Sequence, residues 1–140
     1  MNTIQEKEIP LQNRCKRALL VDNDQDMSWL LKHVLRQMEC DLIITNTWAA
    51  TLNELAKTPL DLILLDIPLV GFSIANFLRV KNQYFPRVPV VIISPSAAEP
   101  ARKKIQEIGQ YAFIDKPFVL DLLVNKIREA LAADMTQSID

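Results

Sequence analysis

Five short apolar runs alternate along the chain with segments of helical spacing, and this alternation limits the folds that the chain can adopt. The runs are continuous, without the polar alternation of a strand that faces solvent on one side. They cover residues 18–21, 42–44, 62–65, 88–93 and 111–114. A continuous apolar run is typical of a strand covered on both faces, as in a parallel sheet. We therefore expect five buried strands.

The segments between the runs carry apolar residues at the spacing of one helix face. The first segment follows Asp26, which we expect to be the N-cap. Its apolar face comprises Met27, Leu30, Leu31, Val34, Leu35 and Met38. Five strand–helix units in strict alternation, joined by right-handed crossovers, predict a three-layer α/β/α sandwich around a five-stranded parallel sheet.

Composition excludes several classes of protein. Sixteen basic and seventeen acidic residues leave a net charge of −1, which argues against a nucleic-acid or membrane-surface binder. Two glycines, Gly71 and Gly109, are too few for a dinucleotide fingerprint or a P-loop. Cys15, Cys40 and His33 cannot form a four-ligand zinc site. Without a membrane-length apolar run or a signal peptide, we expect a cytoplasmic protein.

The chain has room for one domain of common size. Residues 1–16 are polar and lack periodicity, so we interpret them as a flexible N-terminal lead. We expect the domain to cover residues 17–133 and a C-terminal tail to cover residues 134–140.

Polar side chains follow the apolar runs, and in open α/β sheets the ligand site lies beyond the carboxyl ends of the strands. Asp22 and Asn23 follow the first run, and Asp66 follows the third. Ser94 follows the fourth run, and Lys116 comes just after the fifth. Oxygen ligands suit Mg²⁺, and a lysine supplies positive charge for a phosphoryl group. An aspartate there can act as a nucleophile and become an acyl phosphate.

Four segments are similar, in order and spacing, to the signatures of the response-regulator receiver domain: ALLVDND, DLILLDI, VVIISP and FIDKPF. The resemblance covers roughly residues 17–133. It implies a flavodoxin-like receiver fold with strand order 2-1-3-4-5. It also implies a role in two-component phosphorelay signalling.

The resemblance assigns roles to individual residues. Asp66 matches the phosphoacceptor, Ser94 the hydroxyl and Lys116 the lysine that precedes a cis-proline, here Pro117. Phe113 matches the aromatic switch residue, whose rotamer follows the state of the hydroxyl loop.

The implied Mg²⁺ ligands are Asp22, Asn23, Asp66 and the backbone carbonyl of Pro68. Asn23 stands where the family has a second acid, so one negative charge is lost and we expect weak Mg²⁺ binding.

Two prolines depart from the family pattern. At the positions of Pro68 and Pro95 the family offers backbone N–H groups to the phosphoryl oxygens, and proline has none. Loss of one such donor in an oxyanion hole costs about 3 kcal/mol of transition-state stabilisation. We therefore expect both phosphorylation and phosphoryl loss to be slow.

The resemblance implies a stand-alone receiver that accepts a phosphoryl group on Asp66 from a histidine kinase or a histidine phosphotransfer protein. It would act through contacts with an output protein, without binding nucleic acid or membrane. It would not be an enzyme beyond Mg²⁺-assisted self-phosphorylation and dephosphorylation. The alternative is a phosphorylation-independent pseudo-receiver that binds its partners constitutively. A flavin carrier is disfavoured, because the acidic segment 22–26 would repel the flavin phosphate.

Overall fold

A computed structural model describes residues 16–95 and 99–139, with side chains described as far as Ala132. Its five strands form one parallel sheet in the order β2-β1-β3-β4-β5. The strands are β1 (Lys16–Val21), β2 (Cys40–Thr45), β3 (Leu62–Asp66), β4 (Val90–Pro95) and β5 (Ala112–Lys116). The fold class and the strand order predicted from the sequence are confirmed.

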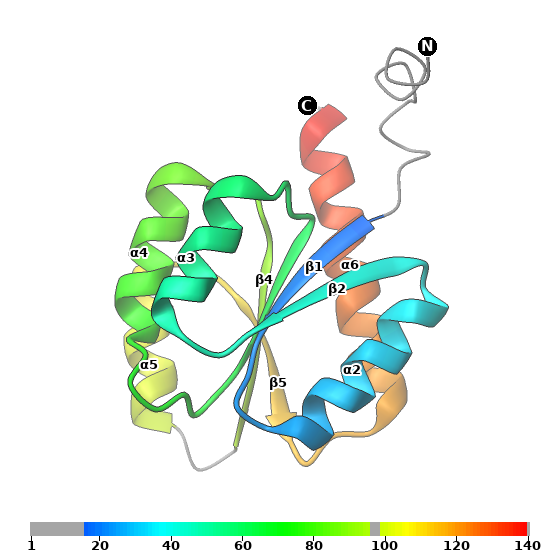
Figure 1. The fold of residues 1–140 in the computed structure, drawn as a ribbon, viewed down its shortest axis with the longest axis horizontal. Helices are drawn as coiled ribbons and strands as arrows, with labels where there is room; N and C mark the ends of the chain where they lie inside the picture. Colours follow the sequence, from blue (N-terminus) through cyan, green and yellow to red (C-terminus); the bar gives the residue numbers. More distant parts are fainter. Residues whose placement is uncertain (1–15, 96–98, 140) are drawn as a thin grey trace.

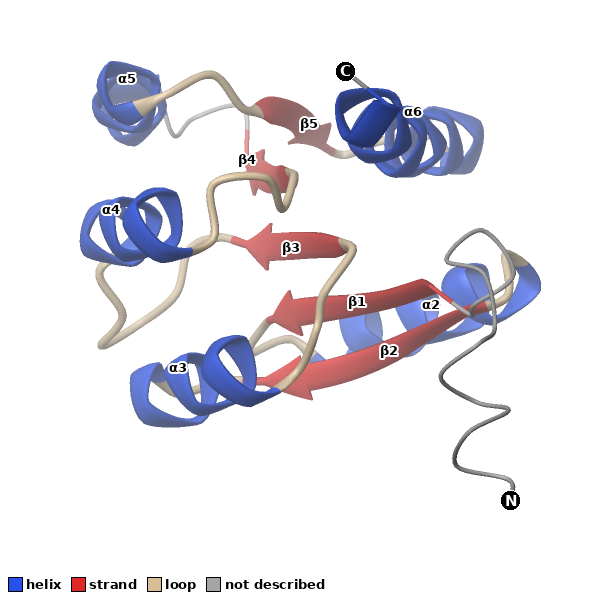
Figure 2. Ribbon diagram, turned by 90° about the horizontal axis from the view of Figure 1, so that it is seen from above, coloured by secondary structure: helices blue, strands red, loops and turns tan. Residues whose placement is uncertain are grey.

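Five helices of the described chain cover the two faces of the sheet (Figures 1 and 2). They are α2 (Gln25–Gln37), α3 (Trp48–Lys57), α4 (Ile74–Tyr84), α5 (Glu99–Ile108) and α6 (Leu120–Ile139). Helices α3, α4 and α5 pack on one face, and α2 and α6 pack on the other. This arrangement is the three-layer sandwich expected from the alternating pattern.

The central strands are buried on both faces because successive side chains enter two different apolar clusters. In β1, Ala18 and Leu20 pack with residues of α2 and α6. Leu19 and Val21 point the other way and pack with residues of α3, α4 and α5. All four side chains are inaccessible to solvent. The continuous apolar run in the sequence is therefore a direct consequence of two covered faces.

Most of the expected N-terminal lead lies outside the described residues, whereas the backbone of most of the expected C-terminal tail is described. Strand β1 begins at Lys16, and the lead expected before it is not described. Helix α6 continues to Ile139, across most of the segment interpreted as a tail. The boundaries 17–133 therefore stay a prediction. Among the helices of the described residues, none has both the length and the apolar composition that a membrane crossing needs.

Helix α2 begins two residues earlier than the sequence analysis expected. Asp24, with extended backbone angles, is the N-cap, and its Oδ1 accepts hydrogen bonds from the backbone N–H of Asp26 at 2.9 Å and of Met27 at 3.5 Å. The prediction of Asp26 as the cap is wrong. Asp26 lies in the first turn, where its negative charge still interacts favourably with the helix dipole.

We expect Asp24→Ala to be less stable than Asp24→Asn by about 1 kcal/mol in urea denaturation. Both variants lose the negative charge, but asparagine keeps an oxygen that can accept the two capping hydrogen bonds. The comparison therefore isolates the cap from the electrostatics of the neighbouring acids. Equal stability of the two variants would contradict the assignment.

Candidate functional site

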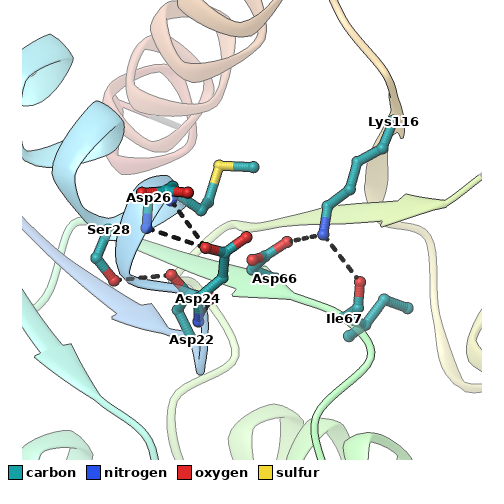
Figure 3. A network of polar contacts seen from close by, with 8 residues as sticks. Asp22, Asp24, Asp26, Ser28, Asp66, Ile67 and Lys116 are labelled. Carbon is teal, nitrogen blue, oxygen red and sulfur yellow. Dashed lines mark hydrogen bonds and ion pairs between the residues drawn. The ribbon is translucent and has the colours of Figure 1, made fainter.

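The strand order brings together the polar residues that end β1, β3, β4 and β5. Asp22 follows β1 directly, Asp66 is the last residue of β3, and Lys116 is the last residue of β5. Ser94 lies in β4, which pairs with both β3 and β5. The carboxyl ends of these strands are neighbours, so the sheet gathers the two acids and the lysine at one end (Figure 3).

Asp22 is held rigidly by neutral donors. Its side chain is buried, at 3% exposure. Its Oδ1 accepts a hydrogen bond from the backbone N–H of Asp24 at 2.8 Å, and its Oδ2 accepts one from the Ser28 hydroxyl at 2.7 Å. Ser28 belongs to α2 and was not among the residues predicted for the site. A serine in the first turns of a helix has no distinctive sequence signal, since the contact depends on how α2 packs.

Asp66 forms an ion pair with Lys116 through Oδ1 (Figure 3). The Lys116 ammonium also donates a hydrogen bond to the carbonyl of Ile67 at 3.2 Å. Asp66 is buried at 3% exposure, whereas the Lys116 side chain is 26% exposed. Apart from the ion pair, Asp66 Oδ1 has no hydrogen-bond partner in the described part of the chain. Lys116 thus links Oδ1 of Asp66 to the Ile67 carbonyl at the end of β3.

The site holds more negative charge than Lys116 balances. Burial is the largest influence and raises the pKa of Asp66 to about 7. The Asp22 carboxyl raises this pKa further, because it can accept a hydrogen bond from the protonated form of Asp66 and because its negative charge disfavours the ionised form. Lys116 lowers the pKa of Asp66 through its hydrogen bond and its charge, without cancelling the other effects. A cation near Asp66 would favour its ionised form.

The oxygen ligands at this end of the sheet are of the kind that binds Mg²⁺, although they are few. Asp22 and Asp66 offer carboxylate oxygens, and the charge near them is uncompensated. Asn23 and Pro68 are exposed on the loops that follow β1 and β3. Over residues 16–95 and 99–132, no group of three or more acidic, histidine or cysteine side chains is placed to bind a metal. Two carboxylates suffice for Mg²⁺, which usually keeps several waters.

The hydroxyl of Ser94 is buried and forms no hydrogen bond with the described residues. Ser94 is fully inaccessible to solvent, and its Oγ has no hydrogen-bond partner among the residues described. A buried hydroxyl without a partner costs free energy, which makes it a natural point of contact for a ligand. Ser94 lies in the strand next to the one that ends in Asp66.

Two peptide bonds beside the site are cis. The Lys116–Pro117 bond has the isomer that the resemblance implied. The Ile67–Pro68 bond is also cis, which the sequence analysis did not anticipate.

Phe113 is held by an arginine that the sequence analysis did not identify. The Arg102 guanidinium of α5 lies over the Phe113 ring, at 4.3 Å from its centroid. The same guanidinium forms an ion pair with Asp115 at 2.8 Å. Nothing in the sequence distinguishes Arg102 from its neighbours Lys103 and Lys104, because the contact depends on the packing of α5 beside β5.

Comparison with known proteins agrees with this geometry. Residues 18–128 match the response regulator receiver domain family. The chain is 28% identical over 115 residues to a putative response regulator NtrX-like protein of Rickettsia bellii. This alignment covers 81% of this chain and 24% of that protein. It is 29% identical over 122 residues to the probable transcriptional regulator ycf29 of Pyropia yezoensis, which covers 85% of this chain and 54% of that protein. The chain thus spans about a quarter of the length of the first relative and about half of the length of the second.

A solved structure shares the fold. The CheY-like response regulator receiver domain protein of Methanospirillum hungatei superposes with a TM-score of 0.80 at 23% sequence identity. The superposition covers 89% of this chain and 99% of that one. At this identity the likeness supports the fold alone.

We expect Asp66→Asn to be more stable than the unmodified protein at pH 8, by on the order of 1–3 kcal/mol after allowance for screening. The folded-state pKa of Asp66, about 7, lies above the ordinary value of 3.8, so ionisation destabilises the fold. The difference should be absent below about 3.8, grow as the pH rises toward 7, and then level off. Urea denaturation across this range measures it.

Asp121→Asn, an exposed aspartate in the first turn of α6, is the matched control for the loss of one charge. A stability gain of Asp66→Asn that did not change with pH would contradict the assignment of the effect to ionisation of a buried acid.

Proposed function

Because the chain belongs to the response regulator receiver domain family, we propose that Asp66 accepts a phosphoryl group and that residues 17–133 act as a receiver in two-component signalling. The donor would be a histidine kinase or a histidine phosphotransfer protein, and output would pass through contacts with another protein. The observation that carries the proposal is the burial of Asp66 at a strand end, paired with Lys116 and close to Asp22.

The proposed reaction uses the two oxygens of Asp66 differently. Oδ1 is buried and holds the ion pair with Lys116, which leaves Oδ2 as the attacking oxygen. Oδ2 forms a bond to the phosphorus of a phosphohistidine, and the phosphorus–nitrogen bond breaks. The histidine ring keeps the electron pair of that bond and takes up a proton if it was neutral. The product is an acyl phosphate on Asp66.

The side chains around Asp66 stabilise the charge that the phosphoryl group brings. The Lys116 ammonium lies against Asp66 and can interact with a phosphoryl oxygen as well. The unpartnered hydroxyl of Ser94 can donate a hydrogen bond to another. Together they supply donors that the two proline positions cannot.

The Mg²⁺ ligands in this proposal are the carboxylates of Asp22 and Asp66, the side-chain oxygen of Asn23 and the carbonyl of Pro68. When bound, Mg²⁺ would neutralise part of the negative charge of the carboxylates and of the phosphoryl oxygens. The hydrogen bonds from Ser28 and from the N–H of Asp24 hold the Asp22 carboxylate in a fixed orientation for this role. Because Asn23 is uncharged, weak binding is expected.

We expect incubation with Mg²⁺ and a small phosphodonor such as phosphoramidate to add one phosphoryl group, detected by intact-protein mass spectrometry. Asp66→Asn should add none, because an amide is not a nucleophile at neutral pH. Asp121→Asn serves as the control and should be labelled like the unmodified protein. Labelling that persists in Asp66→Asn would refute the assignment of the acceptor.

We expect Pro95→Ala to accelerate phosphorylation by about tenfold or more, because it restores a backbone N–H directly after Ser94. Stopped-flow or quenched-flow labelling gives the rate. Pro86→Ala, which changes an exposed proline in the loop before β4, is the control and should leave the rate unchanged. An equal rate in Pro95→Ala and the unmodified protein would show that the missing donor does not limit the reaction.

A phosphorylation-independent receiver is the second candidate function. The observation in its favour is the presence of Asn23, Pro68 and Pro95 at positions where the family uses an acid and two backbone donors. Backbone NMR shifts on addition of Mg²⁺ and beryllofluoride separate the two functions. Shifts around Asp66 and Lys116 that extend to Phe113 support the phosphoacceptor, and an absence of any response supports constitutive binding of partners.

A further inference from the structure

A second polar site lies at the opposite end of the sheet, where β4 and β5 begin. Here the last turn of α4, the loop before β4, the start of β5 and one side of α6 surround an open hollow of about 350 Å³. Helices α4 and α6 cover opposite faces of the sheet (Figure 1). Residues of both helices line the hollow, together with residues at the start of β4 and β5. Its charged lining residues are Lys81, Arg87, Lys126 and Glu129.

Lys81 occupies a position of α4 that faces the core. The other buried residues of this helix are Phe77 and Leu78, and Lys81 follows them at the spacing of one helix face. Only 4% of Lys81 is exposed. Lysine is almost never so deeply buried without a partner of opposite charge. A lysine on an apolar helix face therefore needs an explanation.

The ammonium of Lys81 is only partly compensated. It donates one hydrogen bond, to the carbonyl of Pro86 at 3.2 Å, although it carries three donors. Within the ranges that the structure describes, no carboxylate forms an ion pair with it. The C-terminal end of α4 contributes a favourable dipole. Burial nevertheless lowers the pKa of Lys81, because the charged form remains poorly solvated.

The rim of the hollow adds further positive charge. Arg87 is exposed on the loop before β4, and Lys126 lies half-buried on α6. Glu129 is the one acid among the charged lining residues. Three cations against one acid leave an excess of positive charge, whereas the whole chain has a net charge of −1.

We propose that this hollow binds a small oxyanion, a phosphate or carboxylate group, with Lys81 as its buried anchor and Arg87 and Lys126 at its rim. The anion supplies a negative charge beside the Lys81 ammonium. It also accepts hydrogen bonds from the ammonium protons that the Pro86 carbonyl does not bind. The volume is at the lower end of the range for small-molecule pockets, about 300–1,000 Å³. Glu129 on the rim disfavours a polyanion and leaves room for one anionic group.

The site is separate from the phosphoacceptor. The hollow lies where β4 and β5 begin, and Asp66 and Lys116 lie where β3 and β5 end. The proposal is therefore independent of whether Asp66 is phosphorylated. An anion bound here would couple to the stability of the fold, because it would bind the folded chain and not the unfolded one.

The test uses inorganic phosphate as the probe, at constant ionic strength with chloride as the reference. Phosphate is expected to raise the midpoint of thermal unfolding in a saturable way. Lys81→Met, which keeps the length and apolar character of the side chain, should bind at least about tenfold more weakly. Lys103→Met removes an exposed lysine of α5 and should behave like the unmodified protein. Equal phosphate effects in all three proteins would overturn the proposal.

Amide NMR locates the binding and separates it from the phosphoacceptor site. Shifts with phosphate are expected at Gln110, Tyr111 and Ala112, which line the hollow. Shifts confined to residues around Asp66 and Lys116 would overturn the proposal. Acetate in place of phosphate tells whether a single carboxylate binds as well.

If Lys81→Met does not fold, Lys126→Gln takes its place, because Lys126 is not fully buried. Weakened phosphate binding in Lys126→Gln supports the proposal. Unchanged phosphate binding in Lys126→Gln overturns the proposal, and the hydrogen bond of Lys81 would then serve only to hold the Pro86 loop.

Discussion

The proximity of two buried carboxyl groups, Asp22 and Asp66, is the constraint on which the functional end of the molecule depends. Burial and the nearby charge of Asp22 disfavour ionisation of Asp66, and Lys116 offsets this effect only in part. The fold holds the acids there nonetheless, because each lies at the carboxyl end of a strand whose apolar residues are buried on both faces. Packing of the sheet thus holds together a pair of buried acids whose proximity is electrostatically unfavourable. A bound cation or protonation of Asp66 would reduce this electrostatic cost.

The same packing explains how much the sequence could predict. The continuous apolar runs indicated the strands to within two residues at each end, because burial on both faces leaves no room for polar alternation. The strand order came from resemblance to a family and not from periodicity. Since polar groups are confined to strand ends, Asp22, Asp66 and Lys116 could be placed at one end of the sheet. Their roles remain proposals.

What the sequence did not indicate depends on contacts between elements distant in the chain or on local geometry. The Ser28 hydroxyl contacts Asp22 because the N-cap of α2 is Asp24 and not Asp26, which places Ser28 one turn into the helix. Arg102 lies over Phe113 because α5 packs beside β5, and its two neighbouring lysines have the same sequence pattern. Lys81 is a charged residue at a position where the helical pattern calls for an apolar one. In each case tertiary packing decides which of several equivalent polar residues has a specific contact.

The two ends of the sheet differ in a way that follows from its parallel architecture. Every strand ends on the side where helices begin, so backbone N–H groups and helix dipoles there favour negative charge, and Asp22 and Asp66 lie on that side. The opposite end collects helix C-termini, which favour positive charge, and Lys81 lies in the last turn of α4 there. Among the described residues, Asp22 and Asp66 outnumber the cation Lys116 at the first end, and no carboxylate forms an ion pair with Lys81 at the second. The charge at each end therefore agrees with the two proposals, a cation together with a phosphoryl group at the first end and a single anion at the second.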